Sequence, residues 1–324
     1  MSSLDNKVIL CTGGTGSFGS KFTEVVLAEH NPKSIRIYSR GELAQVEMER
    51  KFKDDRLRFF IGDVRDKERL HRAMDGVDIV IHAAALKHVP VCEYNPIEAI
   101  RTNIMGAVSV VECAIDHKVQ KVIALSTDKA VASLNLYGST KAVAEKLFIQ
   151  ANSYSGGKPP LFSMVRYGNV ANSRGSLIPI LLEQKRIGEV TLTDERMTRF
   201  WLTLEQGVRF VLFCLDQMVG GEVFIPKLPS FKVIDLIETL APNARIINMG
   251  IRPGEKLAEV LISEDEVRYV REFSDYYILQ PSFPFWKKDM LIGGAPVLEG
   301  FSYSSNQCPL PKELVGQLVE ELGL

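Results

Sequence analysis

Residues that can donate and accept protons gather between positions 126 and 141 of this chain. Tyr137 and Lys141 are four residues apart, so a helix that begins near Tyr137 places both side chains on one face. A Lys ammonium beside a phenol favours the phenolate, so we expect Lys141 to lower the pKa of Tyr137. Such a pair takes a proton from a substrate hydroxyl while hydride leaves the same carbon. The spacing is also common on ordinary helix surfaces, and it gains weight here from the glycine motif described below.

Asp128 and Lys129 precede this helix and add a second acid–base pair. A simple alcohol oxidation needs only the Tyr, the Lys and a hydroxyl, which Thr127 supplies. An additional amine and carboxyl group provide what an elimination needs. One group removes an acidic proton next to a carbonyl, and the other protonates a departing hydroxyl. The alternative interpretation is a salt-bridged loop without chemistry.

A glycine-rich run near the N-terminus predicts a dinucleotide site. It follows the first predicted strand and opens the first predicted helix, where glycines allow a tight turn and the backbone approaches a pyrophosphate at the helix N-terminus. A plain strand–helix connection is the alternative. The run spans residues 12–19, and the cofactor contacts expected in it are Gly13, Thr15, Gly16, Ser17, Phe18 and Gly19.

The end of the second predicted strand indicates which dinucleotide binds. NAD-selective sheets usually carry an acidic residue there, whereas this chain has Ser39 and Arg40, a hydroxyl and a guanidinium that suit a 2′-phosphate. We therefore predict NADP rather than NAD, against the alternative of a surface Arg on a turn. Further expected cofactor contacts follow the third and fourth strands: Asp63, Val64, Ala83, Ala84 and Ala85.

These motifs lie at the ends of short, nearly continuous apolar runs, which are typical of strands buried on both faces of a parallel sheet. Repeated strand–helix–strand units predict an α/β fold with a doubly wound parallel sheet of the Rossmann type. The predicted strands cover residues 8–11, 35–38, 58–62, 78–82, 122–126 and 162–166, and the helices between them cover 18–28, 43–52, 67–74, 96–116 and 137–152.

After Tyr167 the pattern becomes less regular and predicts a smaller C-terminal α/β lobe that grips a substrate. Its clearest elements are a helix near 178–185, a strand near 190–193 and a helix near 205–218. We expect residues 1–170 to form the NADP-binding domain, to which later segments can return. Residues 171–324 would mainly form the substrate-binding lobe.

Composition excludes several other classes of protein. The 324 residues hold 39 Lys and Arg against 40 Asp and Glu, a net charge of −1 that gives no electrostatic reason for a nucleic-acid or membrane partner. The five scattered cysteines form no CxxC pair, so we expect neither a metal site nor a disulfide framework. No stretch approaches the roughly 18 apolar residues of a membrane span. Residues 1–6 lack the pattern of a signal peptide, so the expected compartment is the cytoplasm.

Taken together, these residues make the chain resemble the extended short-chain dehydrogenases/reductases. More narrowly, it resembles the family of inverting UDP-N-acetylglucosamine 4,6-dehydratases of pseudaminic-acid biosynthesis. The resemblance implies a homo-oligomer built on dimers, such as a hexamer. The segments that carry it are 12–19, 61–66, 82–90, 102–106, 126–141, 166–170, 173–176, 197–201, 252–257 and 303–306.

The resemblance implies a lyase that binds NADP tightly and regenerates it in each turnover. Tyr137, supported by Lys141, would take the 4-hydroxyl proton while hydride passes from C4 to NADP, and Thr127 would hydrogen-bond the C4 oxygen. Lys129 would remove the C5 proton, and Asp128 would protonate the leaving 6-hydroxyl. Hydride would return to C6. Protonation of C5 from the opposite face, by a donor that stays open, would give the UDP-4-keto-6-deoxy-L-arabino-hexulose.

The resemblance also implies binding roles. Asn103 would order the active-site loop or the cofactor, and the arginines would neutralise the diphosphate of the UDP-sugar. The chain departs from its relatives at 132–134, where they commonly have Asn-Pro-Ile, and at Ala258, which replaces a His. The expected substrate contacts are Lys87, Asn169, Ser173, Arg174, Arg199, Arg252 and Glu255.

Two other functions remain open on this fold. A nucleotide-sugar 4-epimerase or a retaining dehydratase would keep the oxidation chemistry. Asp128 and Lys129 argue against simple epimerisation, because that reaction removes no proton from C5. A non-catalytic NADP-binding sensor would keep the glycine motif and lose the catalytic pair, so the intact Tyr137 and Lys141 count against it.

Overall fold

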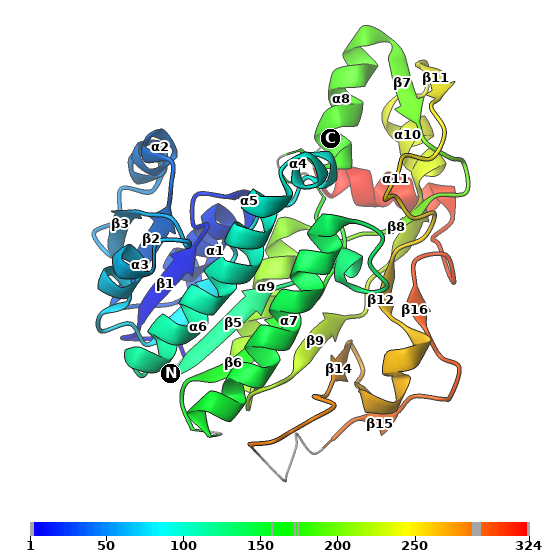
Figure 1. The fold of residues 1–324 in the computed structure, drawn as a ribbon. Coiled ribbons are helices and arrows are strands. Elements are labelled where there is room, and N and C mark those ends of the chain that lie inside the picture. The colour runs from blue at the N-terminus through cyan, green and yellow to red at the C-terminus, as the bar shows by residue number, and fades with distance from the viewer. Residues whose placement is uncertain (1–2, 157, 172, 174, 287–292, 323–324) are drawn as a thin grey trace.

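The structure, a computed structural model, describes residues 3–156, 158–171, 173, 175–286 and 293–322. A large twisted sheet with helices on both faces forms one side of the molecule, and a smaller lobe adjoins the ends of its strands (Figure 1). Among the described residues, no helix combines the length and the apolar character that crossing a bilayer requires.

The large sheet has ten strands, seven of which run parallel in the order β3-β2-β1-β4-β5-β6-β9. This strand order confirms the predicted doubly wound Rossmann-type sheet, whose order reverses between β1 and β4. Each of the first six strands lies within one residue of its predicted bounds. They are β1 (Val8–Thr12), β2 (Ser34–Ser39), β3 (Leu57–Ile61), β4 (Ile79–His82), β5 (Lys121–Leu125) and β6 (Leu161–Val165).

Four strands from the second half of the chain extend this sheet beyond β6. Strand β9 (Val223–Pro226) pairs in parallel with β6, and β14 (Tyr276–Leu279) then pairs antiparallel with β9. Strands β13 (Val270–Glu272) and β15 (Ala295–Pro296) complete the edge, also antiparallel. Part of the irregular region after Tyr167 therefore returns to the main sheet.

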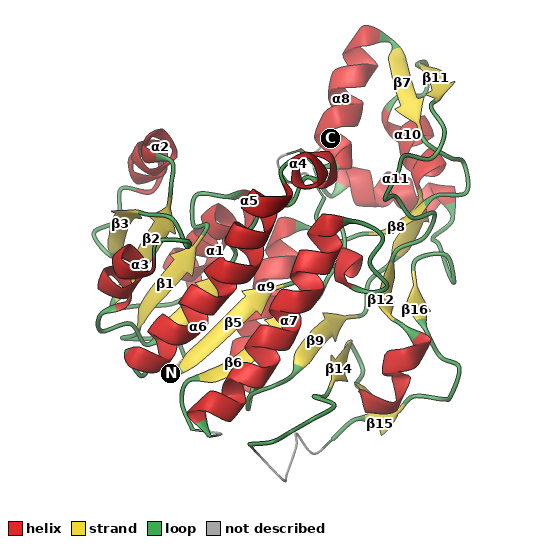
Figure 2. Cartoon of the chain, in the orientation of Figure 1, coloured by secondary structure: helices red, strands yellow, loops and turns green. Residues whose placement is uncertain are grey.

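Helices bury one apolar side on each face of the sheet (Figure 2). One face carries a core built around Leu70, Val110 and Phe148, and the other a core around Phe22, Val26 and Val211. On the first face lie α3 (Lys67–Met74), α6 (Gly106–Asp116) and α7 (Leu136–Ser155), and on the second α1 (Ser17–Glu29), α2 (Glu42–Phe52) and α9 (Leu204–Gln217).

The predicted single helix over 96–116 is wrong in its middle. The structure has α5 (Pro96–Ile100), a π-helical turn η1 (Arg101–Met105) and then α6, preceded by the short helix α4 (Val89–Tyr94), which the sequence pattern did not reveal. A π turn inserts an extra residue into a helix and is frequent at functional sites. Here it contains Thr102 and Asn103, both buried.

The smaller lobe has its own apolar core, which includes Trp201, Phe231 and Leu236. Three two-stranded sheets and three helices build the lobe and its junction with the large sheet. The helices are α8 (Leu177–Ile187), α10 (Val233–Leu240) and α11 (Lys312–Glu320), and the strands are β7 (Glu189–Leu192), β8 (Thr198–Phe200), β10 (Ser230–Lys232), β11 (Arg245–Asn248), β12 (Val260–Ile262) and β16 (Tyr303–Ser304).

Candidate active site

The carboxyl end of β5 turns directly into the candidate site. Thr127 ends the extended segment, its hydroxyl accepts a hydrogen bond from the Lys129 backbone, and Asp128–Ala130 form a 3₁₀ turn. Helix α7 begins a few residues later, with the Asn135 side chain capping the Gly138 amide at 2.8 Å. A Cβ at Gly138 would lie 2.0 Å from the Lys129 carbonyl oxygen, so only glycine lets α7 pack this closely against the turn.

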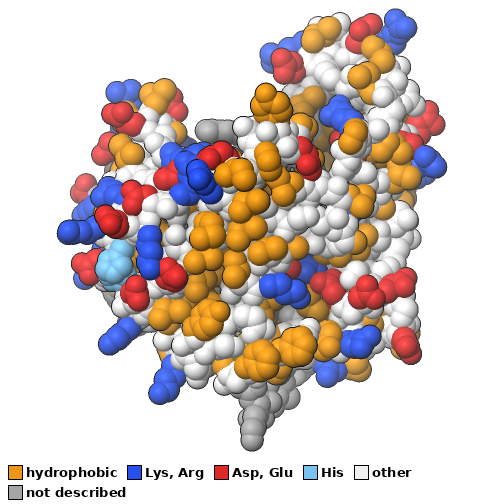
Figure 3. Space-filling view, in the orientation of Figure 1, with side chains coloured by type: hydrophobic (Ala, Val, Ile, Leu, Met, Phe, Trp, Pro, Cys, Tyr) orange, Lys and Arg blue, Asp and Glu red, His pale blue; other side chains and the backbone are white. Residues whose placement is uncertain are grey.

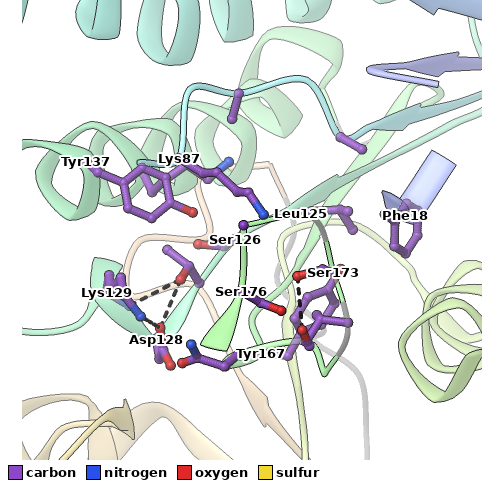
Figure 4. A pocket seen from close by; sticks show the side chains of 18 of the residues that line it. Phe18, Lys87, Leu125, Ser126, Asp128, Lys129, Tyr137, Tyr167, Ser173 and Ser176 are labelled. Carbon is purple, nitrogen blue, oxygen red and sulfur yellow. Dashed lines mark hydrogen bonds and ion pairs between the residues drawn. The ribbon is translucent and has the colours of Figure 1, made fainter. Parts of the chain in front are cut away.

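All five predicted catalytic residues line one cavity of about 340 Å³ (Figure 4). Tyr137 and Lys87 lie on one side of it, and Lys129 with Asp128 lies on the other. Parallel strands bring their carboxyl ends to one edge of a sheet, which explains why segments far apart in sequence meet here. Other predicted residues that line the cavity are Phe18, Ala83, Ala85, Asn169 and Ser173.

Asp128 and Lys129 contact each other directly: Lys129 Nζ lies 3.0 Å from Asp128 Oδ1. Asp128 is fully buried, and burial raises the pKa of its carboxyl even though the Lys129 ammonium opposes the shift. A carboxyl group that holds its proton can serve as a general acid. Burial alone would lower the pKa of Lys129, but Asp128 and Glu259 outweigh it and the net shift is upward.

The expected effect of Lys141 on Tyr137 is wrong. Burial raises the pKa of Tyr137 to about 12, and the groups that oppose this shift are the Lys129 ammonium and a hydrogen bond with Thr127. Burial lowers the pKa of Lys141 itself to about 8, against the attraction of Glu145. The ammonium that most lowers the pKa of the phenol is therefore that of Lys129, in the turn after β5.

Glu259, which the sequence analysis missed, belongs to the same cluster. Its Oε1 lies 3.1 Å from Lys129 Nζ and 3.6 Å from Arg199 Nε. The side chain is only 2% exposed, and its Oε2 has no hydrogen-bond partner among the described residues. One signal was available in the sequence: Glu259 is a charged residue inside the apolar run 257–262.

A second cavity, of about 600 Å³, lies beside the carboxyl ends of β1, β2, β3 and β4. Gly13 has a φ of +68°, and a Cβ there would lie 2.8 Å from the Ala84 amide nitrogen, so any side chain would fill the space between the β1 and β4 ends. Thr102 Oγ1 is buried in the same region, with no hydrogen-bond partner among the residues described. These features suit a nucleotide that needs close backbone approach and hydrogen bonds.

The predicted cofactor residues divide into three groups in the structure: those that line the second cavity, those that line only the first (Phe18, Tyr137 and Lys141) and those that line neither. Asn103 uses its side-chain amide to hold the Leu86 backbone and the Thr140 hydroxyl, which orders the loop after β4. Lining the second cavity are Gly13, Thr15, Ser39, Arg40, Asp63, Val64, Ala83, Ala84 and Ala85. Gly16, Ser17, Gly19 and Asn103 line neither this cavity nor the first.

A third cavity, of about 280 Å³, lies between the smaller lobe and the 3₁₀ turn Asp128–Ala130, called the catalytic turn below. It shares Lys129 and Asn169 with the first cavity, so the two adjoin. Asn169 Oδ1 and Glu255 Oε2 are buried and have no hydrogen-bond partner in the part of the chain that the structure describes. The predicted substrate residues that line it are Asn169, Arg199, Arg252 and Glu255.

Arg199, one of the predicted substrate residues, already has hydrogen-bond partners within the protein. Arg199 donates from Nη1 to the Thr198 and Leu257 carbonyl oxygens at 2.7 and 3.2 Å, so protein groups already hold it in place. Arg174 lies outside the described residues. No cluster of His, Cys, Asp and Glu among the described residues has a geometry that could hold a metal ion.

Comparison with known proteins places this site in a family. The profile described as polysaccharide biosynthesis protein matches residues 9–281. The chain is 52% identical to a UDP-N-acetylglucosamine 4,6-dehydratase (inverting) of Campylobacter jejuni, over 94% of each chain. It is 43% identical to a UDP-glucose 4-epimerase of Rickettsia conorii, over 84% of this chain and 82% of that one. The crystal structure of Pen from Bacillus thuringiensis matches with a TM-score of 0.93 and 36% identity over 99% of both chains.

A Rossmann-type sheet with a Tyr137–Lys141 pair beyond the end of β5 defines an extended short-chain dehydrogenase/reductase. Within that class, the chain belongs to the polysaccharide biosynthesis protein family. The resemblance to the inverting UDP-N-acetylglucosamine 4,6-dehydratases that the sequence motifs indicated is confirmed by the extent of the identity.

Proposed function

We propose that this protein is an inverting UDP-N-acetylglucosamine 4,6-dehydratase that uses NADP. One observation carries the proposal. An elimination pair, Asp128 and Lys129 at 3.0 Å, lines the same cavity as an oxidation pair, Tyr137 and Lys141. Residues 1–170 would mainly bind the cofactor and residues 171–324 the UDP-sugar, with the nucleotide in the third cavity and the hexose in the first.

Oxidation of the sugar at C4 is the first step that the site performs. The nicotinamide, when bound, accepts a hydride and later returns it. Tyr137 takes the proton of the 4-hydroxyl, while the hydroxyl of Thr127 orients the C4 oxygen. Lys141 lines the same cavity, and its pKa of about 8 lets it hold or release a proton near neutrality.

Elimination follows because a ketone at C4 acidifies the proton on C5. Lys129 removes this proton in its neutral amine form, and Asp128 protonates the departing 6-hydroxyl, which leaves as water. One proton that moves from the Lys129 ammonium to the Asp128 carboxylate leaves Lys129 as a neutral amine and Asp128 as a protonated carboxyl group, which are the forms that the elimination needs. Their 3.0 Å contact is short enough for this transfer.

Proton NMR of the purified protein with NADP and UDP-N-acetylglucosamine in heavy water tests this proposal. We expect loss of water, a new methyl signal from C6, deuterium at C5 and the coupling pattern of an inverted C5. The same product with C5 configuration retained would contradict inversion, and an unchanged spectrum would leave only a binding role.

A UDP-sugar 4-epimerase is the second candidate, which the 43% identity to the Rickettsia conorii protein favours. Epimerisation returns the hydride to C4 and removes no proton from C5. Recovery of a 4-epimer without deuterium at C5 in the same experiment would replace the dehydratase proposal with this one.

Arg40 supports the choice of NADP. Its side chain is 60% exposed at the end of β2, with Nη1 3.9 Å from Asp63 Oδ2, so it can turn toward a 2′-phosphate. We expect Arg40→Ala to weaken NADP binding by about tenfold to a hundredfold, the range of one charge-assisted hydrogen bond, while NAD binding changes little. Titration calorimetry with both dinucleotides measures this. Arg196→Ala, in the distant lobe, is the control, and an equal loss for both dinucleotides would contradict the NADP assignment.

An exposed apolar face supports the proposed homo-oligomer. Hydrophobic side chains gather along the centre of one side of the molecule, over α5, α6 and α7 (Figure 3). Exposed hydrophobic residues on these helices and the segments next to them are Tyr94 at the end of α4, Ile97 of α5, Met105 of the π turn and Val143 of α7. A patch of this kind on a protein surface marks an interaction site, and we propose a second copy of the chain as the partner, in a dimer or in a hexamer built from dimers.

We expect Ile97→Glu combined with Val143→Glu to convert the oligomer into monomers, because carboxylates at the contact would lose their hydration. Light scattering on a size-exclusion column measures the mass. Leu43→Glu, at a more exposed apolar position on α2, should leave the mass unchanged.

A cytoplasmic location and a role in pseudaminic-acid biosynthesis stay predictions.

A further inference from the structure

Glu259 is held rigidly although none of the proposed catalytic steps uses it. Its backbone amide donates to Ser305 Oγ at 2.9 Å, and the Ser305 amide donates back to the Glu259 carbonyl oxygen at 2.9 Å. Ser305 is fully buried and also contacts Thr198. The β12–β16 pairing thus fixes the carboxylate of Glu259 against Lys129, a residue some 130 positions earlier in the chain.

The two carboxylates that contact Lys129 have different surroundings. Asp128 can exchange a proton with Lys129 and also reaches the hexose cavity. Glu259 lines the third cavity and not the first, and it is paired with a second cation, Arg199. Burial raises the pKa of Glu259, but Lys129 and Arg199 outweigh it, so its pKa is lowered and it stays ionised.

We propose that Glu259 is a positioning residue that keeps Lys129 in its ammonium form and pointed at Asp128, and that Arg199 weakens this hold. The catalytic part of this inference rests on the proposed function, in which Lys129 is the base that removes the C5 proton. Lys129 can act as that base only after its ammonium has given up a proton. In that step an N–H bond of Lys129 breaks and an O–H bond forms on Asp128. The neutral amine then takes the C5 proton, and Asp128 passes its own proton to the leaving hydroxyl.

Charged and titratable groups face Lys129 from several elements. Asp128 comes from the turn after β5, Glu259 from the residue before β12, and Tyr137 from α7. Two cations, Arg199 from β8 and Lys256 from the preceding loop, act against the ammonium. Glu259 and Asp128 are the only described carboxylates in ion-pair contact with Lys129, so removing one halves the stabilising charge.

Competitive acetylation of the intact protein, read by peptide mass spectrometry over a range of pH, measures the pKa of Lys129 without depending on enzyme activity. We expect Glu259→Gln to lower this pKa by about 1 to 3 units, since a contacting opposite charge shifts a pKa by this amount. At a fixed alkaline pH, Lys129 would then be acetylated at least about tenfold faster. Glu259→Asp, which keeps the charge, should retain most of the wild-type value.

Arg199→Gln tests the opposite direction and guards against a folding defect in Glu259→Gln. It removes the cation that competes for Glu259, so acetylation of Lys129 should become slower. Glu222→Gln is the matched control, because Glu222 is equally buried but binds Ser163 and Gly220, away from Lys129. Lys227, paired with Glu272, serves as the internal reference for reagent reactivity.

An unchanged Lys129 pKa in folded Glu259→Gln, or no slowing in Arg199→Gln, would overturn the inference. Failure of the proposed function appears separately, as absence of the dehydrated product in the NMR experiment with the wild-type protein. Where that product forms, the alkaline limb of the pH profile of kcat/KM should move to lower pH in Glu259→Gln and not in Glu222→Gln.

Discussion

Lys129→Ala is expected to lower the rate of water elimination by about 10³-fold or more, the upper range for a general base, while the C4 oxidation survives. Lys129 is the one amine in contact with Asp128 among the described residues. Without it, no group in that pair can remove the C5 proton. The oxidised sugar should therefore remain bound, and the near-ultraviolet absorbance of reduced nicotinamide should persist after substrate is added.

Tyr137→Phe is the matched variant, because it should stop the reaction one step earlier. The phenol oxygen is what accepts the 4-hydroxyl proton, so neither reduced nicotinamide nor dehydrated sugar should form. Dinucleotide binding, measured by calorimetry, should persist in both variants. Turnover of Lys129→Ala at the wild-type rate would show that another residue is the base.

Arg166→Met is expected to lower the free energy of unfolding by about 3–5 kcal/mol, the cost of breaking a buried ion pair. Arg166 is 2% exposed and joins β6 to two carboxylates, with Nη2 2.6 Å from Glu145 Oε2 and 2.9 Å from Glu266 Oε1. Its Nη1 also donates to the Leu261 carbonyl oxygen at 2.8 Å. The methionine would leave both carboxylates without a counter-charge.

The pH dependence of this loss has a definite sign. Burial raises the pKa of Glu266, but Arg166 outweighs it and the net pKa is lowered, so wild-type stability from this group is lost as pH falls through the folded pKa. In Arg166→Met, burial of Glu266 is no longer opposed by Arg166, so its pKa lies above the ordinary value and protonating it relieves the defect. The stability difference between the two proteins should therefore narrow as pH falls from the raised pKa of Glu266 in the variant to its lowered pKa in the wild type.

Urea unfolding at neutral and acidic pH measures this gap. Arg209→Met is the control, because Arg209 also bridges two carboxylates, Glu29 and Glu205, but on the surface, where ion pairs contribute little. A loss in Arg166→Met no larger than that in Arg209→Met would contradict the assigned role.

The first six strands were predictable because a strand buried on both faces needs a nearly continuous apolar run. The π turn over 101–105 was not, since its residues have the same apolar spacing as an ordinary helix. Its extra residue is stabilised by contacts outside the helix, such as those of Asn103 with the Leu86 backbone.

At the candidate site, the acid–base residues could be predicted from the sequence, whereas the residues that contact them could be identified only from the structure. Motif spacing was enough to bring together Asp128, Lys129, Tyr137 and Lys141, because they follow one strand within 14 positions. The residue that the second half of the chain contributes to this cluster could not be predicted from motif spacing. Glu259 lies far along the chain, and its contact with Lys129 exists only because β12 pairs with β16 beside the catalytic turn.

The sequence by itself determined the parallel sheet, the glycine turn for a dinucleotide and the acid–base groups after β5, because each depends on residue types at short spacing. Only the tertiary structure decided which charges those groups meet. The state of a proton on Lys129 or Tyr137 depends on burial and on charges a few ångströms away, and those distances arise from packing between segments that the sequence separates widely.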